Sequence, residues 1–381
     1  MLYPSLNTPA VLIDLDKLET NIREISRLAA AAGVRLRPHT KLHECVEIAR
    51  MQLDAGACGI EVGAVEQAGA MVDGGIHDVV VAHPFFGEHK LAALKRLLER
   101  PEAKITVVID MVEQAEAISR VARETRREVS FFLKVDTGVD RYGVLPGATT
   151  LDLAREASKL PNMKFIGIYA HESGLNIAKG IEQGALEVAT AMTETARLLT
   201  REGFKPESVG VGASPTFRTM CRYLKEGRFP EITEIHPGAL YVGDVTHVRE
   251  GANTLDTCAL TVLTAVQSAS HPAHVVIDAG FKTFGADSII AKRDTPGFFW
   301  KGRPSWGYVK GRPDLWFGRS TAERGLLYYK EDSQKDIKLG DRLEIIPNNA
   351  TIAVNIHSEM YGVRKGKIEK VIPVAGREKG S

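Results

Sequence analysis

A short segment, RPHTKLH at positions 37–43, places a lysine between two histidines just after an apolar run. The amine of Lys41 can form a Schiff base with a carbonyl cofactor if its surroundings lower its pKa. Positive charge from Arg37, His39 and His43 would contribute to such a shift. A lone lysine on a loop is more commonly a solvated side chain, but this crowded setting favours a chemical role.

A second candidate site is the glycine-rich segment GVGASPT at positions 210–216. Small residues follow a β-like run there, and Pro215 leads into a helical pattern at 217–224, which predicts a helix N-terminus with available backbone amides. Gly238 follows the next run, so both loops could bind one anion, most simply a phosphate. Small residues also serve tight turns, and that alternative stays open here.

Two more polar positions could contact a bound group. The turn DTGVDRYG at 136–143 contains Arg141, whose guanidinium could hydrogen-bond a phenolate or a carboxylate. The alternative is a structural turn with a surface ion pair. His171 ends another apolar run and could pack on a cofactor ring, although a histidine in a strand is more often satisfied within the core.

These residues need a scaffold, and the first two-thirds of the chain alternate short apolar runs with helical patterns such as Leu91–Glu99, Met111–Glu124 and Ile181–Arg201. The runs are Val34–Pro38, Ala57–Val62, Asp78–His83, Ile105–Asp110, Ser130–Asp136, Phe165–His171, Ser208–Ser214 and Glu234–Val242. Polar residues mark their ends: Lys41, Glu61, His83, Asp110, Asp136, His171 and Ser214, with His236 near the start of the eighth. Eight units with polar strand ends predict an α/β fold, a (β/α)8 barrel of the TIM type with its active site at those ends. No glycine fingerprint follows the first run, which disfavours a doubly wound open sheet.

From about residue 250 the pattern becomes mostly β. The expected strands are Ala259–Val266, Ala273–Ile277, Gly325–Tyr329, Asp341–Ile346, Thr351–Asn355 and Lys367–Val374, and Pro9–Asp14 is expected to pair with them. We therefore predict a cofactor-binding barrel over 15–250 and a smaller β-rich domain from 1–14 plus 251–381. The aromatic and basic segment 294–319 lacks clear periodicity; it either lines the substrate entrance or packs at a dimer interface.

Composition restricts the function further. The 381 residues carry 49 Lys+Arg and 48 Asp+Glu, a net charge of +1 that disfavours a nucleic-acid binder relying on a basic field. No run of 18 apolar residues predicts a membrane span, and the first residues lack a signal-peptide pattern. The four cysteines form no CxxC pair, so neither a disulfide framework nor a cysteine zinc site is expected, and a cytoplasmic location fits best.

The lysine, the arginine and the phosphate loops together resemble the fold-type III pyridoxal-phosphate enzymes, the alanine-racemase-like class. Several segments are more specifically similar to its D-threonine aldolase and D-serine dehydratase branch. They are TPAVLIDLD at 8–16, RLRPHTKLH at 35–43, EIAR at 47–50, VDTG at 135–138 with Arg141, Pro237-Gly238 through Tyr241 and Asp244, and IDAG at 277–280 with Lys282.

The resemblance implies that Lys41 carries pyridoxal 5'-phosphate as a Schiff base. Arg141 would then lie against the phenolic oxygen of the cofactor and His171 at its ring. The remaining cofactor contacts would come from Gly212, Ala213, Ser214, Gly238 and Ala239 around the phosphate, and from Tyr241. The resemblance also implies a homodimer whose active site is completed across the interface, with a small amino acid as substrate and the cofactor as electron sink.

One segment departs from the family. Aldolases and dehydratases of this branch carry a metal pair in the pattern Pro-Asn-His-x-Cys, or the same with Asp in place of Cys. Here positions 347–351 read PNNAT, so Asn349 and Thr351 occupy the ligand positions. Neither is a competent zinc ligand, and His357 stands elsewhere in the pattern. We therefore predict no catalytic metal at this site.

The preferred function is a lyase, an aldolase that cleaves a D-3-hydroxy amino acid without that metal, with His43 or His39 as base for the 3-hydroxyl. A racemase or epimerase would need only Lys41 and a second base, for which tyrosines such as Tyr308 are candidates. A dehydratase is a further alternative. It ranks below the aldolase because loss of the metal would hinder dehydration more than cleavage. A non-catalytic pyridoxal-phosphate-binding protein is disfavoured by the long C-terminal domain. The sequence does not indicate which amino acid is the substrate.

Overall fold

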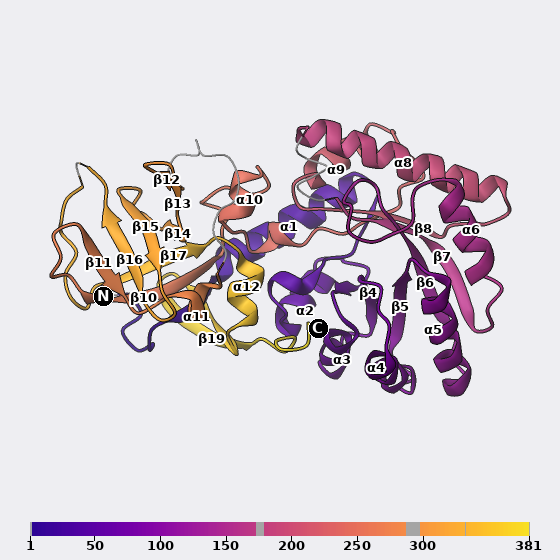
Figure 1. Ribbon diagram of the computed structural model, residues 1–381, viewed down its shortest axis with the longest axis horizontal. Helices are drawn as coiled ribbons and strands as arrows, with labels where there is room; N and C mark the ends of the chain where they lie inside the picture. The colour runs from indigo at the N-terminus through magenta and orange to yellow at the C-terminus, as the bar shows by residue number, and fades with distance from the viewer. Residues whose placement is uncertain (1, 173–178, 287–297, 332, 381) are drawn as a thin grey trace. The chain divides into compact units, whose positions relative to one another are not determined.

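A computed structural model describes residues 2–172, 179–286, 298–331 and 333–380. The chain forms two compact units (Figure 1). The first contains Met1–Asn21, Leu42–Glu44 and Ala239–Arg377, and the second contains Ile22–Lys41, Cys45–Gly238 and Glu378–Ser381. Each unit is described by itself below.

The second unit is built on eight parallel strands. They are β2 (Arg35–Leu36), β3 (Ile60–Val62), β4 (Asp78–Val81), β5 (Lys104–Ile109), β6 (Val129–Val135), β7 (Met163–Ala170), β8 (Ser208–Val211) and β9 (Glu234–Ile235). Their order is β2-β9-β8-β7-β6-β5-β4-β3. Hydrogen bonds from Cys58 N to Leu36 O (2.9 Å) and from Glu61 N to Pro38 O (2.8 Å) join the two outer strands and close the ring. The predicted (β/α)8 barrel is therefore confirmed.

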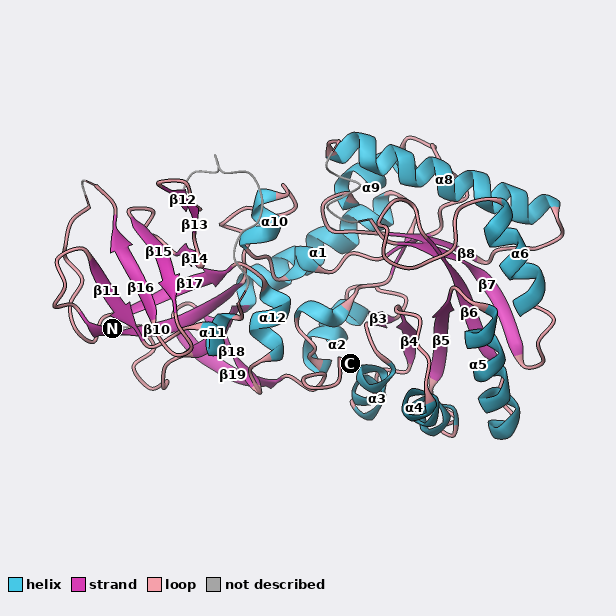
Figure 2. Cartoon of the chain, in the orientation of Figure 1, coloured by secondary structure: helices cyan, strands magenta, loops and turns pink. Residues whose placement is uncertain are grey.

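Helices follow the strands and cover the outside of the barrel (Figure 2). They are α2 (Val46–Asp54), α3 (Val65–Asp73), α4 (Glu88–Leu98), α5 (Val112–Thr125), α6 (Ala148–Ala157), α8 (Ile181–Arg201) and α9 (Phe217–Lys225), while α1 (Leu15–Ala31) precedes β2. The helical periods noted in the sequence coincide with α4, α5 and α8. Apolar side chains at helical spacing bury one face of each, as in α4, where Ala93, Leu94, Leu97 and Leu98 are buried.

The barrel interior is apolar on one side and polar on the other. Val80, Val108, Phe132 and Tyr169, from four successive strands, pack into one buried cluster. Lys134 lies two residues after Phe132 on β6, so it faces the same interior. The eighth predicted strand, 234–242, is much shorter than expected, because Pro237 cannot donate to a ladder and a 3₁₀ turn, η2 (Ala239–Tyr241), follows it.

The first unit is mostly β, as predicted. Its nine-stranded sheet has the path β15-β16-β11-β10-β1-β18-β19, with β17 joining β10 and β14. The strands are β1 (Ala10–Asp14), β10 (Leu260–Ser268), β11 (His274–Ile277), β14 (Gly307–Val309), β15 (Leu315–Ser320), β16 (Gly325–Tyr329), β17 (Arg342–Pro347), β18 (Glu359–Arg364) and β19 (Lys367–Pro373). Three short helices accompany them: α10 (Val245–Arg249), α11 (Phe281–Phe284) and α12 (Ala350–Asn355). As expected, β1 pairs within this unit, antiparallel to β10 and parallel to β18.

One expectation for this unit was wrong. Residues 351–355 form a helix rather than a strand, because Asn349 caps the first turn and overrides the β-branched composition. The described part of 294–319 contains short strands, namely β14, β15 and the pair β12 (Phe299–Trp300) and β13 (Arg303–Pro304). Residues 294–297 lie outside the described residues. None of the helices in the described ranges is long and apolar enough to cross a membrane.

Candidate active site

A small pocket lies among the strand ends of the barrel, and every one of its lining residues belongs to the second unit. Those residues are His39, Lys41, Ala82, His83, Lys134, Arg141, Tyr142, Tyr169 and His171. They follow or end β2, β4, β6 and β7, which is the face where barrels place their catalytic groups. Four residues predicted from sequence, His39, Lys41, Arg141 and His171, are thus brought together.

Lys41 lies in a 3₁₀ turn, η1 (Thr40–Leu42), that follows β2. The turn is held in place because the Thr40 hydroxyl donates to the carbonyl of Glu61 (3.0 Å) and the Lys41 amide donates to Nδ1 of His39 (3.3 Å). Burial lowers the pKa of Lys41, and Arg141 adds to this, against the opposing effect of the Glu61 carboxylate. A lysine with a lowered pKa is a better nucleophile at neutral pH.

Lys134 is a second amine in this pocket. Its side chain is almost fully buried, and Nζ lies 3.7 Å from the ring centroid of Tyr169. Burial lowers the pKa of Lys134 to about 7; Glu61 opposes the shift, and Arg141 contributes to it. The amine is therefore held by an aromatic face instead of a carboxylate.

None of the pocket cations, Lys41, Lys134 and Arg141, forms an ion pair with a carboxylate of the described residues. Arg141 donates to the Tyr142 hydroxyl (2.8 Å) instead. The carboxylate that acts on both lysines is Glu61, which is fully buried. Burial would raise the pKa of Glu61, but His39 and His236 hold it well below its usual range. An excess of positive charge around a pocket favours an anionic ligand.

The glycine-rich loop lies beside this pocket. The Glu172 amide donates to the Gly212 carbonyl (3.4 Å), so the end of β7, where His171 stands, adjoins the loop after β8. A Cβ on Gly212 would come within 2.7 Å of the His236 backbone nitrogen, so only glycine permits this approach of two strands. The Gly238 amide donates to Oγ of Ser214 (3.3 Å), which joins the two loops expected to share a phosphate. Ala213 is buried in the same loop.

The other predicted residues lie in the first unit. His43 is fully buried there, and Ala239 and Tyr241 form part of the turn η2. The Tyr241 hydroxyl is buried and has no hydrogen-bond partner among the described residues. Such a group is available to a bound ligand.

The barrel and the C-terminal region each match a family model. Residues 13–245, more than half of the chain, match the model "Alanine racemase, N-terminal domain". The chain belongs to this alanine racemase N-terminal domain family. Residues 259–363 match a second model, "Putative serine dehydratase domain". Both matches agree with the resemblance drawn from the sequence motifs.

Individual relatives of this racemase-like chain are lyases by name. The chain is 31% identical to a 3-hydroxy-D-aspartate aldolase of Paracoccus denitrificans, over 98% of this chain and 93% of that protein. It is 28% identical to a D-threo-3-hydroxyaspartate dehydratase of Delftia, over 91% of each. The crystal structure of D-threonine aldolase from Filomicrobium marinum superposes with a TM-score of 0.86 at 26% identity, covering 99% of this chain and 98% of that one.

In the first unit, the side chain of Asn349 caps a helix. Its Oδ1 accepts hydrogen bonds from the amides of Thr351 (3.0 Å) and Ile352 (3.4 Å), which caps α12. Asp244 completes the cap by accepting from the Ala350 amide (2.9 Å) and also binds Nδ1 of His247 (2.6 Å). Within the described ranges, no three His, Cys, Asp or Glu side chains are grouped so as to hold a metal ion.

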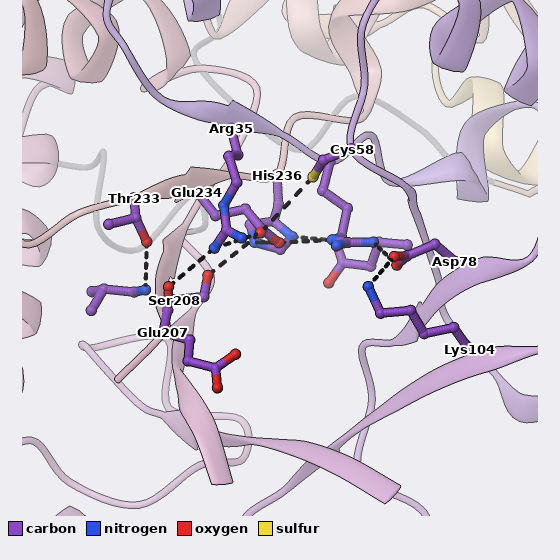
Figure 3. Close-up of polar contacts among 12 residues, drawn as sticks. Arg35, Cys58, Asp78, Lys104, Glu207, Ser208, Thr233, Glu234 and His236 are labelled. Carbon is purple, nitrogen blue, oxygen red and sulfur yellow. Dashed lines mark hydrogen bonds and ion pairs between the residues drawn. The ribbon is translucent and has the colours of Figure 1, made fainter. Parts of the chain in front are cut away.

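A second group of charges includes the first residues of β4, β5 and β9, namely Asp78, Lys104 and Glu234 (Figure 3). Arg37 donates from Nε to Glu234 (2.7 Å) and from Nη1 to Asp78 (2.7 Å), and both Arg37 and Glu234 are buried. Lys104 binds the other oxygen of Asp78 (2.6 Å) from an exposed position. His236 lies between Glu234 and Glu61, 3.4 Å from each. Arg37, Asp78, Lys104 and Glu234 are thus bound to one another by ion pairs.

Sequence reasoning assigned no chemical role to four polar or aromatic pocket residues: His83, Lys134, Tyr142 and Tyr169. The signal for Lys134 was a single charge inside the apolar strand FFLKV, on the face shared with Phe132. The signal for His83 was its position at a strand end. Tyr142 stood next to Arg141 in a turn, where the sequence alone does not indicate which side chain faces the pocket.

Proposed function

We propose that this protein is a pyridoxal-phosphate-dependent aldolase that cleaves a D-3-hydroxy amino acid without a metal at the Asn349–Thr351 position. The observation that carries the proposal is the pocket in which Lys41, Lys134 and Arg141 converge without carboxylate partners, beside a loop of backbone amides. A phosphate, a phenolate and a substrate carboxylate would supply the missing negative charge.

The residues present fit this cofactor. Lys41 would bind its aldehyde, Arg141 its phenolic oxygen and His171 would lie at its ring. Gly212, Ala213, Ser214, Gly238 and Ala239 would hold the phosphate, and the unpartnered hydroxyl of Tyr241 offers a further donor. The close approach at Gly212 and the Ser214–Gly238 hydrogen bond keep the loop in the shape that an anion requires.

When bound, the cofactor supplies an electron sink for the charge that develops at Cα of the substrate. The chain supplies proton transfer and orientation. Lys41, whose pKa burial lowers, can hold or release a proton at Cα. The cationic pocket orients the substrate carboxylate, and a pocket imidazole must accept the proton of the 3-hydroxyl as the bond between Cα and C3 breaks.

The absence of a catalytic metal is proposed from chemistry and geometry. An amide and a hydroxyl replace the histidine and thiolate of the branch, and the amide oxygen of Asn349 is already used to cap α12. If EDTA reduces activity and zinc or manganese restores it, this part of the proposal is wrong.

We also propose a homodimer whose active site is completed by the partner subunit, in a cytoplasmic setting. Phe86, Met111 and Leu145 follow β4, β5 and β6 and are 61%, 52% and 64% exposed, which forms an apolar rim at the strand ends. Such a rim suits burial under a second copy. All four cysteines are free, in keeping with a reducing compartment. Sedimentation of the wild type and of Leu145→Glu tests the dimer: a monomeric wild type contradicts it.

The deciding experiment incubates the purified protein with D-threonine, 3-hydroxy-D-aspartate and other D- and L-amino acids in heavy water with EDTA, followed by proton NMR. Glycine plus an aldehyde or 2-oxo acid is the expected result. A 2-oxo acid with ammonia would assign a dehydratase. Loss of the Cα proton with equilibration of enantiomers would assign a racemase.

Lys41→Ala is expected to lose cofactor absorbance and cleavage together, because the buried amine that binds the aldehyde is gone. Circular dichroism controls for folding. A well-folded variant that retains the absorbance of the bound cofactor would refute the assignment of Lys41.

A further inference from the structure

The geometry points to His83 as the catalytic base that accepts the proton of the 3-hydroxyl group of the substrate. This inference rests on the proposed aldolase function and assigns one of its steps to a residue that the sequence had placed only at a strand end. It also identifies which group does the work that a metal would otherwise assist.

His83 is placed by the end of β4. It follows the buried Ala82 and lines the same pocket as Lys41 and Arg141. Its ring meets His39 edge-on at a centroid distance of 6.3 Å and Tyr142 at 5.7 Å, so two neighbours fix its orientation. The ring therefore has a defined position on the pocket wall.

The nitrogens of His83 are available for proton transfer. Neither forms a hydrogen bond with any described residue, and the side chain is only partly buried. His39 is less suited, since it is 4% exposed and its Nδ1 accepts from the Lys41 amide. His171 is expected at the cofactor ring, and His43 is fully buried and is not among the residues that line the pocket. His83 is thus the pocket imidazole whose ring nitrogens have no other assigned hydrogen bond or role.

The charges around His83 keep it neutral, and only a neutral imidazole can act as a base. Burial lowers the pKa of His83 to about 4, and Lys41, Arg141 and Lys134 add to this, while Glu61 opposes it. Anionic groups arriving beside Lys41 and Arg141 offset those cations and raise the basicity of the ring. Neighbouring His39 is likewise kept neutral by burial, which lowers its pKa.

Tyr142 completes this wall. Burial raises the pKa of Tyr142 to about 12, against Arg141, so the hydroxyl keeps its proton at neutral pH. A proton acceptor and a proton donor therefore stand side by side, an arrangement suited to binding a hydroxyl group, which is both donor and acceptor.

The step balances as follows. The O–H proton of the substrate passes to the free nitrogen of His83, and the electron pair of that O–H bond forms the carbonyl at C3. The bond between Cα and C3 breaks, and its electron pair remains at Cα. A proton then joins Cα, which yields glycine and the carbonyl compound. No oxidant or reductant is required.

The test separates cleavage from chemistry at Cα. Wild type and His83→Gln, each loaded with pyridoxal phosphate, are compared for cleavage of D-threonine and for exchange of the Cα proton of glycine in heavy water. Removing a general base costs roughly 10²- to 10⁴-fold, so cleavage should fall by that factor. Glycine has no 3-hydroxyl, so its exchange should stay within a few-fold of wild type, as should cofactor affinity measured by absorbance titration.

Two controls complete the experiment. His77→Gln removes an exposed histidine at the opposite end of the same strand and should change neither rate. His83→Ala with added imidazole should regain part of its cleavage rate, which a purely structural loss would not do. Cleavage at the wild-type rate in His83→Gln overturns the inference, as does an equal loss of cleavage and exchange. A wild type that cleaves no 3-hydroxy amino acid refutes the proposed function itself.

Discussion

Buried charges at the two ends of the barrel differ in whether they form ion pairs. Near the amino ends of β4 and β9, Arg37 is bound by Asp78 and by Glu234, each at 2.7 Å. At the carboxyl ends, Lys41 and Lys134 are buried with no carboxylate in ion-pair contact among the described residues. The same scaffold therefore contains one group of charges that is complete in itself and one that is not.

The difference separates structural charge from functional charge. A paired cluster needs no ligand, and removing one member leaves a buried charge uncompensated. An unpaired cluster carries a cost in the ligand-free protein that an incoming anion can relieve, so it marks a binding site. Counting charged residues would not distinguish the two clusters, whereas the partners of each residue do.

The largest effect on stability is expected at the paired end. Arg37→Met leaves Glu234 buried opposite an apolar side chain and should lower the free energy of unfolding by about 3–5 kcal/mol. Urea denaturation of the cofactor-free protein measures it. A second change, Glu234→Gln, should restore part of the loss, and no recovery in the double variant would contradict the pairing.

At the unpaired end we expect a smaller effect, which is a gain in stability as the pH rises. Because the pKa of Lys134 is lowered to about 7, the unfolded chain binds more protons than the folded one between pH 7 and its ordinary value. Stability should therefore increase as the pH rises through this range, by on the order of 2 kcal/mol after allowing for water in the pocket. Lys134→Met should remove this slope. An identical pH dependence in wild type and variant would show that burial does not lower the pKa of Lys134.

The smallest effect is expected where a pair is exposed. Lys104 binds Asp78 at 2.6 Å, but its side chain is 72% exposed. Lys104→Met should change stability by roughly 0–1 kcal/mol, since solvent screens such pairs. A loss as large as that of Arg37→Met would mean that burial does not determine the strength of these pairs, and it would undermine the comparison.

Much of the scaffold could be predicted because the barrel repeats a simple local pattern. The apolar runs produced the strands and the helical periods produced the helices, and three of the polar residues noted at the run ends, Lys41, His83 and His171, line the pocket. Lys41 is about 100 positions from Arg141 and farther from His171. All three nevertheless line one pocket, because the strand ends of a barrel meet at one face. Their chemical roles remain proposals.

The sequence misled where local structure departs from the repeat. The eighth run, 234–242, looks like one strand, but β9 covers only Glu234–Ile235, because Pro237 cannot donate to a ladder and a 3₁₀ turn follows it. Residues 351–355 look like a strand by composition, but Asn349 supplies a helix cap that composition does not weigh. The role of Lys134 depends on neighbours from other strands, which a single sequence does not display.

The position of β1 has a consequence for how the chain folds during synthesis. This strand comprises Ala10–Asp14, but its partners in the sheet, β10 and β18, lie about 250 and 350 positions later. The segment leaves the ribosome before both partners, yet it cannot be incorporated into the sheet until they have been made. In the meantime it is an unpaired apolar strand, exposed to chaperones and proteases while the barrel can already assemble. A strand that is translated before the barrel is thus completed in its sheet only after the barrel.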